Sequence, residues 1–419
     1  MLFRSAVLTL VAAAGTAPGE LPWLAELALP DDDGGWAPAG ELARPGSPLV
    51  DVLASGALGV LDPDFAAGQD AAALRAVGVL DTFALRTADD PDELDVDRVD
   101  EWVDTVLDRL PADAPPPAWP TLTAVGDLEL VRDWRRALPL LAALPAAARA
   151  DVHLGGTVVP GYLRWWLRTS PVLDGVRPDR LRHPQGTELQ GLYEPVDDLV
   201  SEVLELLRPP AAVAEVLADV DDAIDLLHRL GNPTRTVAPA VLRTVYARLA
   251  TVLDGVDVAP PTRVRVAPGQ VSEEAVVLDA PWLQPLAELP VLPAGGLPAP
   301  VAELLDLPLA SELEGRARVT SRAARTVPWS AVPGAELAAL RLGVPELTGQ
   351  VAVHPTLTVT GGRPVSWWPG EVDAVDGTPA ALGRALAWRA GRWPSRQSLA
   401  EAFAHPQRAA ELAAEDALS

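Results

Sequence analysis

A single hydrophobic core stops growing at about 250–300 residues, and this chain has 419 residues. Two or three domains are therefore expected. Hydrophobic residues make up 49% of the chain, which supplies enough apolar surface for real cores and argues against global disorder. The sequence thus predicts a multidomain globular chain.

The charge of the chain limits its partners. The formal net charge is −25, and all 33 basic residues are Arg because Lys does not occur. Nucleic acids and anionic membranes are polyanions, so this charge opposes nonspecific binding to either. The densest arginine stretches, such as Arg132–Arg136, also contain acidic residues, and no arginine cluster stands out. We expect neither nucleic acid nor a membrane as a partner.

Residue types that are missing exclude several kinds of chemistry. The chain has no Cys, which excludes disulfide bonds, zinc–thiolate sites and cysteine nucleophiles and fits a reducing cytoplasm. The lack of Lys excludes a P-loop and a Schiff base. No Ser lies in a G-x-S-x-G sequence, and the His residues are too far apart for an H-E-x-x-H motif. We therefore assign no catalytic, cofactor-binding or metal-ligating residue.

Polar and aromatic groups that could mark a site have structural interpretations as well. Asp31–Gly35 lacks the spacing of an EF-hand and is interpreted as a solvated turn, and Asp92–Asp100 and Asp219–Asp225 as polar helix faces. Each His is interpreted as a surface or hydrogen-bonded structural residue: His153, His183, His228, His354 and His405. Among thirteen Trp, the pairs Trp165-Trp166 and Trp367-Trp368 could stack on a ligand. Because neighbouring residues on a strand face opposite ways, we expect one Trp of each pair in the core and the other between layers.

Three regions are distinguished by their patterns, and the first covers residues 1–150. It is a mixed α/β region that begins with short elements interrupted by Gly and Pro. We predict a short helix over Leu74–Val79 that runs into a strand over Leu80–Leu85. A helix is predicted over Val96–Leu110, and a further helix over Asp127–Leu144, which Pro139 kinks or divides. A proline-rich break, Pro111–Pro120, separates the last two.

The second region, residues 151–260, is mainly helical. Apolar residues recur at helical spacing in four segments, and Pro239 suits the first turn of the last one. Two glycine pairs are interpreted as turns: Gly155-Gly156 in this region and Gly295-Gly296 in the next. The predicted helices are Val158–Leu167, Pro195–Leu207, Ala212–Leu230 and Pro239–Leu253.

The third region, residues 261–419, changes to strand-like segments and then returns to helix. Gly361-Gly362 lies between two apolar runs and is a good signal for a two-residue β-hairpin. The expected fold class is α+β and multidomain, with a helix-rich middle and a C-terminal α+β region that contains the hairpin. Predicted strands are Arg263–Ala267, Ala275–Leu278, Gln350–Thr360 and Arg363–Trp368, and predicted helices are Pro379–Ala390 and Ser398–Ala417.

The start of the chain allows three interpretations. Leu2–Ser5 matches the translation of a common sequencing adapter, which suggests that residues 1–5 are non-native and that the natural protein continues upstream. Ala6–Gly15 is an apolar run too short to span a bilayer. It is then an ordinary helix or strand of a core, unless it is a signal peptide cleaved after Ala17 or part of a genuine cytosolic start.

Several stretches together resemble a known family. In the first half they are Leu21–Leu24 leading into Asp31–Trp36, Gly78–Phe83 and Asp127–Val131; in the second half they are Val276–Trp282, Leu304–Ser311 and Leu382–Trp388. This series resembles the C-terminal portion of large ATP-binding proteins of high-GC bacteria whose N-terminal domain is sacsin-like. That domain belongs to the GHKL ATPases typified by the ninety-kilodalton heat-shock chaperone. The resemblance covers nearly the whole chain after Ser5.

The ATP site that the resemblance implies is not in this chain. The family holds its metal ion with an Asn that follows a Glu by four residues, whereas Asn232 is the only Asn here and His228 stands four residues before it. The family's Asp-x-Gly-x-Gly turn is also missing, since Asp32 is followed by Trp36 in place of the second Gly. ATP and Mg²⁺ are therefore expected only in an N-terminal domain upstream of this fragment.

The resemblance implies a non-catalytic region of a chaperone-type protein. It would bind client or partner proteins, or relay the state of the upstream ATPase domain of the same polypeptide. Two alternatives stay open: a free-standing carboxylate-based hydrolase, which needs at least two convergent carboxylates with shifted pKa values, and a secreted binding protein, which depends on the signal-peptide interpretation of Ala6–Gly15.

Overall fold

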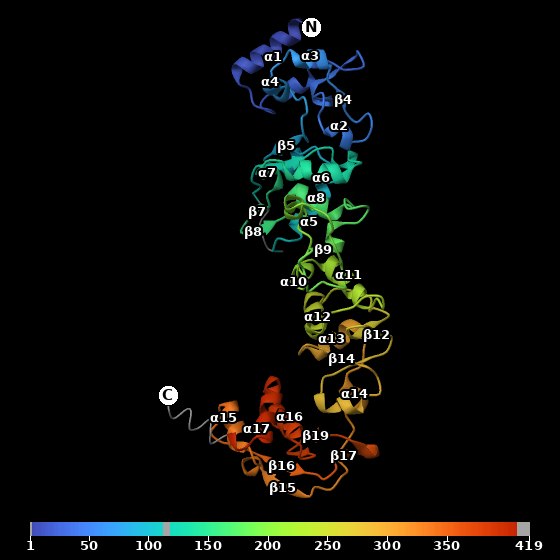
Figure 1. Cartoon of the computed structure of the whole chain (residues 1–419), viewed down its shortest axis with the longest axis vertical. Helices are drawn as coiled ribbons and strands as arrows, with labels where there is room; N and C mark the ends of the chain where they lie inside the picture. Colours follow the sequence, from blue (N-terminus) through green and yellow to red (C-terminus); the bar gives the residue numbers. More distant parts are fainter. Residues whose placement is uncertain (1, 112–117, 409–419) are drawn as a thin grey trace. The chain divides into compact units, whose positions relative to one another are not determined.

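The computed structural model describes residues 2–111 and 118–408, which form two compact units (Figure 1). The N-terminal unit comprises residues 1–212 and the C-terminal unit residues 213–419. The division falls within the region predicted to be mainly helical. Both units combine short helices with small sheets, which confirms the α+β class. Residues 112–117 of the predicted proline-rich break lie outside the described residues, as does the predicted helix beyond residue 408.

The N-terminal unit is built from short elements that alternate along the chain. Its helices are α1 (Leu2–Ala14), α2 (Leu49–Val52), α3 (Pro63–Ala67), α4 (Ala71–Ala76), α5 (Val99–Leu107), α6 (Trp134–Ala142), α7 (Ala146–Arg149), α8 (Tyr162–Thr169) and α9 (Ser201–Leu207). Its strands are β1 (Ala28–Pro30), β2 (Trp36–Pro38), β3 (Leu42–Ala43), β4 (Gly59–Val60), β5 (Leu85–Ala88), β6 (Leu122–Val125), β7 (Val152–Leu154), β8 (Thr157–Val159), β9 (Leu181–Arg182) and β10 (Glu194–Pro195).

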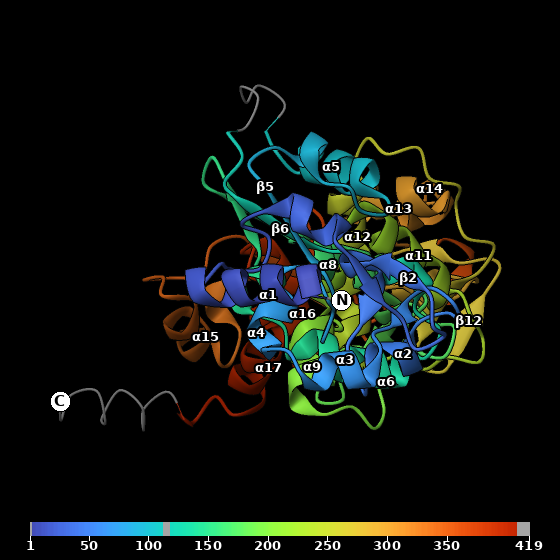
Figure 2. The ribbon, with the colours of Figure 1, turned by 90° about the horizontal axis from the view of Figure 1, so that it is seen from above.

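The apolar run near the N-terminus forms α1, which packs against α4 (Figures 1 and 2). Leu8 and Val11 are buried on one face, whereas Phe3 and Leu10 are exposed on the other. This face-wise distribution is that of an amphipathic surface helix. No helix in the described ranges is long and apolar enough to cross a bilayer.

A larger core in the same unit surrounds α8. Its buried side chains come from α5, α6, α8, α9 and β6, so most of the unit after Leu49 contributes to one cluster. Trp102 on α5 is 1% exposed, and its indole N–H donates to the Pro160 carbonyl over 3.0 Å. Its ring meets Tyr162 edge-on at a centroid distance of 5.9 Å. Aromatic packing therefore joins α5 to α8.

The C-terminal unit contains most of the longer helices. These are α10 (Val213–Val216), α11 (Val220–Leu230), α12 (Pro239–Val252), α13 (Pro298–Leu305), α14 (Ala310–Glu314), α15 (Ala335–Leu342), α16 (Pro379–Arg389) and α17 (Arg396–Ala404). Its strands are β11 (Val264–Ala267), β12 (Gln270–Ser272), β13 (Val276–Val277), β14 (Val291–Leu292), β15 (Arg325–Pro328), β16 (Gln350–Val353), β17 (Thr358–Val359), β18 (Arg363–Pro364), β19 (Trp367–Trp368) and β20 (Val372–Val375).

A four-stranded sheet organises the end of this unit. Its strand order is β15-β16-β20-β19, with β16 and β20 parallel and the outer pairs antiparallel. Asp373 on the inner strand β20 is 2% exposed and accepts hydrogen bonds from the Trp329 indole, over 3.1 Å, and from the Arg389 guanidinium. This buried polar network ties the sheet to α16, which packs on α17 (Figure 1).

A buried arginine organises the beginning of the unit. The Arg265 guanidinium on β11 donates to three backbone carbonyls, those of Leu230 at 3.0 Å, Asn232 at 2.5 Å and Pro268 at 3.0 Å. Burial lowers the pKa of Arg265, because desolvation disfavours its charged form. The contacts fasten the turn after α11 to the hairpin of β11 and β12.

Several predicted helices are confirmed with shorter bounds. The helices α5, α12 and α16 lie within Val96–Leu110, Pro239–Leu253 and Pro379–Ala390. The single helix predicted over Ala212–Leu230 is wrong, because α10 ends at Val216 and Asp219 caps a separate helix, α11. The helix predicted over Val158–Leu167 begins only at Tyr162, since Val158 pairs in β8, and the one over Pro195–Leu207 begins at Ser201. Within Asp127–Leu144, α6 continues through Pro139 after a separate 3-10 turn.

The strand predictions are less accurate. The strand expected within Leu80–Leu85 is wrong, because β5 begins at Leu85 and pairs with β6. Gln350–Thr360 is not one strand, since β16 and β17 belong to different sheets and Pro355 lies between them. The hairpin at Gly361-Gly362 is confirmed, with Val359 opposite Arg363, so that its loop has one residue more than expected. Both glycines adopt positive φ, at 79° and 72°, which favours Gly.

Candidate functional site

The acidic runs form turns and helix caps. Asp31 accepts a hydrogen bond from the Gly35 N–H over 2.5 Å within the β1–β2 hairpin, while Asp32 and Asp33 are exposed. Asp219 caps α11 by accepting from the Asp221 and Asp222 N–H groups. In residues 2–111 and 118–408, no group of three or more His, Asp or Glu side chains could hold a metal ion.

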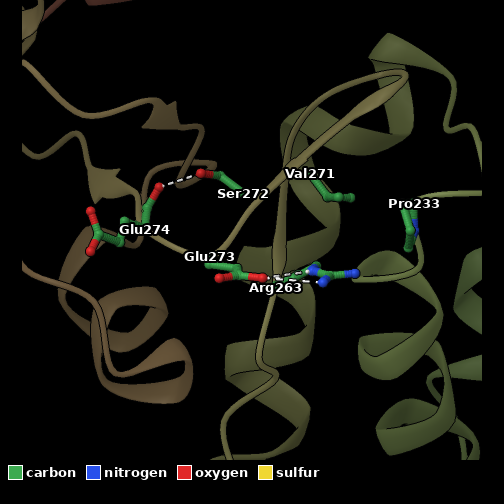
Figure 3. Close-up of a pocket in the computed structure, with 6 residues that line it drawn as sticks. All are labelled: Pro233, Arg263, Val271, Ser272, Glu273 and Glu274. Carbon is green, nitrogen blue, oxygen red and sulfur yellow. Dashed lines mark hydrogen bonds and ion pairs between the residues drawn. The ribbon is translucent and has the colours of Figure 1, made fainter.

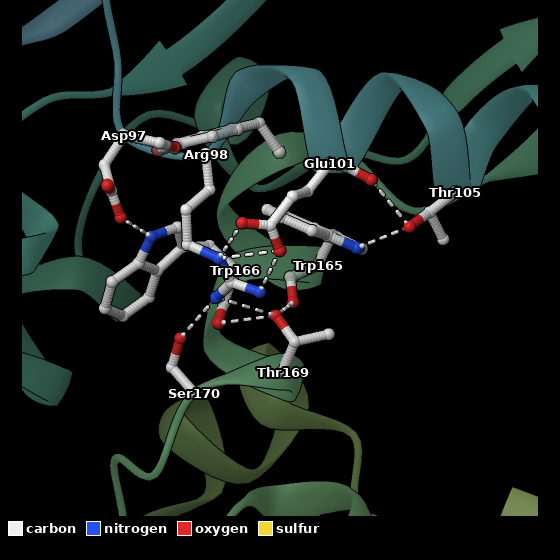
Figure 4. Close-up of polar contacts among 9 residues, drawn as sticks. Asp97, Arg98, Glu101, Thr105, Trp165, Trp166, Thr169 and Ser170 are labelled. Carbon is white, nitrogen blue, oxygen red and sulfur yellow. Dashed lines mark hydrogen bonds and ion pairs between the residues drawn. The ribbon is translucent and has the colours of Figure 1, made fainter. Parts of the chain in front are cut away.

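The first tryptophan pair lies in a buried polar and aromatic network between α5 and α8 (Figure 4). Both indoles are buried, rather than one of them, because the core surrounds α8. The Trp165 N–H donates to Thr105 Oγ1 over 3.1 Å, and the Trp166 N–H donates to Asp97 Oδ2 over 2.9 Å. Each indole N–H therefore has an acceptor, as buried polar groups require.

Arg98 connects the same network to the surface. It adopts a positive φ of 55° at the start of α5, and its guanidinium lies 4.8 Å from the Trp165 ring centroid (Figure 4). It pairs with Glu101 over 2.8 Å and so lowers the pKa of that carboxyl. Further hydrogen bonds lead to the Thr169 and Ser170 hydroxyls. The arrangement is a structural joint between α5 and α8.

A carboxyl near this joint has a raised pKa. Burial raises the pKa of Glu129, and the negative charges of Asp97 and Asp127 raise it further. Burial also raises the pKa of Tyr162, whose hydroxyl donates to the Asp97 carbonyl over 2.6 Å. Both shifts follow from the cost of burying a negative charge beside other carboxylates.

A surface depression lies beside the β11–β12 hairpin (Figure 3). Its lining includes Arg263 and Glu273, which form an ion pair over 3.1 Å, and Ser272, whose hydroxyl donates to the Glu274 carbonyl. Arg263 and Glu273 are both exposed. Ligand sites usually bury their polar groups among apolar ones, so this shallow depression is a weak candidate for substrate binding.

One histidine does contact a possible nucleophile. His354 is buried, and its Nδ1 lies 2.9 Å from Ser321 Oγ, which also accepts the Thr358 N–H over 3.1 Å. The serine hydroxyl can then donate to Nδ1, an arrangement open only to the neutral imidazole. Burial lowers the pKa of His354. The pair fastens the loop at Ser321 to the turn before β17.

The His354 environment predicts a pH-dependent stability. Its folded-state pKa lies below its ordinary value of 6.5, so the unfolded chain binds the proton more readily. The stabilising contribution is complete above about pH 6.5 and is lost as the pH falls through the lowered folded-state pKa. Urea denaturation measures the free energy of unfolding at pH 7.5 and at pH 5.5. We expect this free energy to fall more between the two pH values in the wild type than in His354→Gln. Equal losses in both proteins would contradict the prediction.

Four tryptophans of the C-terminal unit form a cluster at its surface, which we call the indole cluster: Trp282, Trp367, Trp388 and Trp393. Trp282 meets Trp388 edge-on at a centroid distance of 4.9 Å and Trp367 at 5.9 Å. Trp393 stacks on Trp367 at 5.6 Å and meets Trp388 at 6.1 Å. Trp388 is 36% exposed, and Trp282 and Trp393 are half-buried. The cluster thus presents fixed indole surface to solvent.

The second tryptophan pair lies on β19, where neighbouring side chains face opposite ways, so only Trp367 belongs to the indole cluster. Trp367 is buried with α15, α16 and α17, whereas its neighbour Trp368 is half-buried against a different core. Sequence reasoning identified this pair but missed Trp388 and Trp393. These two tryptophans are five residues apart in the sequence, with arginines between and after them, and this pattern could have indicated an aromatic and basic surface.

The expectation that no arginine cluster stands out is wrong for this part of the chain. Residues 377–400 contain four Arg and no Asp or Glu: Arg384, Arg389, Arg392 and Arg396. The Arg396 guanidinium lies 5.0 Å from the Trp393 ring centroid. Although the chain as a whole is negative, residues 377–400 form a positively charged segment that borders the indole cluster.

Comparison with family models, curated proteins and solved structures finds no match to this chain. The resemblance to sacsin-like proteins therefore depends only on the sequence stretches named above. The geometry of the indole cluster is the main structural guide to function.

Proposed function

We propose that this chain is the non-catalytic C-terminal region of a sacsin-like, chaperone-type ATP-binding protein of the cytoplasm. It binds client or partner proteins through the indole cluster of its C-terminal unit. The upstream ATPase domain of the same polypeptide supplies the site for ATP and Mg²⁺. The exposed indole surface is the observation that supports this proposal.

The indole cluster has the properties of a protein-binding surface. Tryptophan is enriched among the residues that dominate binding energies, because it buries a large area and loses little conformational freedom. Here the freedom is already restricted, since the Trp388 ring contacts the Trp282 and Trp393 rings. A partner that covers Trp388 gains apolar contact without first ordering the side chain.

The alternative of a carboxylate-based hydrolase has weaker support. The raised pKa of Glu129, beside Asp97 and Asp127, is one property that such an enzyme needs. The Asp97 carboxylate, however, already accepts a structural hydrogen bond from the Trp166 indole, and the Asp97 main-chain carbonyl accepts one from the Tyr162 hydroxyl. This favours a role of Asp97 in joining α5 to α8.

Replacement of Trp388 tests the proposed function. We expect the chain to suppress aggregation of a thermally unfolded model protein, measured by light scattering. Trp388→Ala should require about tenfold more protein for half suppression, the loss typical of a central interface tryptophan. The matched control is Trp23→Ala, which removes a 66% exposed indole from the N-terminal unit and should leave suppression unchanged.

Two results would contradict the proposal. One is equal suppression by the wild type and Trp388→Ala when urea denaturation shows both to be folded. The other is binding of Mg²⁺–ATP to this chain in calorimetry, because the proposal places the nucleotide site in the upstream domain.

A further inference from the structure

Three arginines beside the indole cluster have no carboxylate partner. In the part of the chain that the structure describes, no Asp or Glu lies within ion-pair distance of Arg384, Arg392 or Arg396. Arg384 contacts the Ser366 hydroxyl at 3.5 Å, and Arg396 donates to the Trp393 carbonyl over 3.1 Å. Arg392 is exposed. Most of their charge is therefore available to a partner.

The fourth arginine of the segment shows the contrast. Arg389 donates to the buried Asp373 and to the carbonyls of Gly370 and Glu371. Its charge is neutralised by the Asp373 carboxylate. The positive charges of Arg384, Arg392 and Arg396 are not neutralised in this way, although the chain has 58 acidic residues against 33 basic ones.

These arginines lie next to the indoles on the same elements. Arg384 precedes Trp388 by four residues on α16, so both lie on one face of the helix. Arg392 directly precedes Trp393, and Arg396 lies over the Trp393 ring. The surface therefore combines exposed aromatic area with three unpaired positive charges.

We propose that this surface docks an acidic segment of a partner protein that carries aromatic or aliphatic side chains among its carboxylates. This inference rests on the proposed function and names the class of partner. Guanidinium groups hold carboxylates through paired hydrogen bonds, and the indoles cover apolar side chains. The net charge of −25 repels such a segment from most of the chain. Residues 315–335 also contain four Arg and no Asp or Glu, but their one Trp, Trp329, is fully buried, so only the indole cluster combines unpaired arginines with exposed indole surface.

Calorimetry with a designed peptide tests the proposal on the full chain. The probe is a synthetic 15-residue peptide of alternating Glu and Leu or Phe, and its matched control has Gln in place of every Glu. We expect the Glu peptide to bind at least tenfold more tightly than the Gln peptide. Its affinity should fall about tenfold between 50 mM and 500 mM salt, because salt screens exposed charges.

Variants assign the binding to named residues. The double variant Arg392→Ala/Arg396→Ala should weaken binding of the Glu peptide about tenfold, whereas the control Arg316→Ala, at an exposed arginine after α14, should not. Urea denaturation checks that each variant is folded. Equal affinity for the Glu and Gln peptides, or an equal loss in Arg316→Ala, would overturn the proposal. Displacement of the peptide by a single-stranded oligothymidylate would do so too, since it would show a nucleic-acid surface.

The two proposals fail in distinguishable ways. If aggregation suppression depends on Trp388 but the Glu peptide shows no preference over the Gln peptide, the partner class is wrong and the proposed function stands. If suppression is independent of Trp388, the proposed function is wrong whatever the peptide does.

Discussion

Alanine at position 373 is expected to lower the free energy of unfolding of the C-terminal unit by about 3 kcal/mol. Asp373 is 2% exposed on β20 and accepts hydrogen bonds from Trp329 and Arg389. Its removal leaves the buried Trp329 indole N–H without an acceptor and removes the carboxylate that pairs with the partly exposed Arg389 guanidinium, and an unpaired buried group costs free energy. Urea denaturation at pH 7, followed by tryptophan fluorescence, measures the change.

Two variants separate the parts of this effect. Asp373→Asn keeps an oxygen that can accept the Trp329 N–H but removes the charge that pairs with Arg389, so we expect an intermediate loss. Arg316→Ala changes an exposed arginine of the same unit and should change stability by less than about 0.5 kcal/mol. A loss in Asp373→Ala no larger than that of Arg316→Ala would show that the network contributes little.

Trp102→Ala is expected to destabilise the N-terminal unit by about 4 kcal/mol, within the range for buried tryptophan. Trp102 is 1% exposed, and its ring contacts Tyr162 on α8 and also Trp119. The substitution removes apolar contact, leaves a cavity between α5 and α8, and leaves the Pro160 carbonyl without its indole donor. The measurement is the urea-induced unfolding of the full chain, followed by circular dichroism.

Trp102→Phe provides the matched control. It keeps an aromatic ring against Tyr162 but loses the hydrogen bond to Pro160, so its loss should be clearly smaller than that of Trp102→Ala. Equal losses for the two variants would mean that the hydrogen bond, and not the packing of the ring, joins α5 to α8.

Local signals explain several helix boundaries, although the prediction over Ala212–Leu230 missed the cap at Asp219 and α13, α14 and α15 were not predicted. Pro239 begins α12 in its first turn, and Asp219 caps α11 with its side chain. Such effects act over a few residues, so they can be recognised in the sequence. The turn at Gly361-Gly362 is local in the same way, since only residues that tolerate a positive φ fit there.

The sheets could not be predicted in the same way. Several strands have only two residues, which is too short for a recognisable alternation. The parallel pairing of β16 with β20 joins segments separated by a hairpin and by β19. Strand partners are chosen by contacts distant in sequence, and the pattern of one segment does not identify its neighbour.

The candidate site shows the same division. Composition by itself determined the overall acidity, the absence of Cys and Lys and the chemistry that their absence excludes. Only the tertiary structure placed Trp282 against Trp388 and separated the neutralised Arg389 from the unpaired Arg392. The physical reason is that residue types fix which interactions are possible, whereas burial and distance, set by the packing of remote segments, decide which of them form.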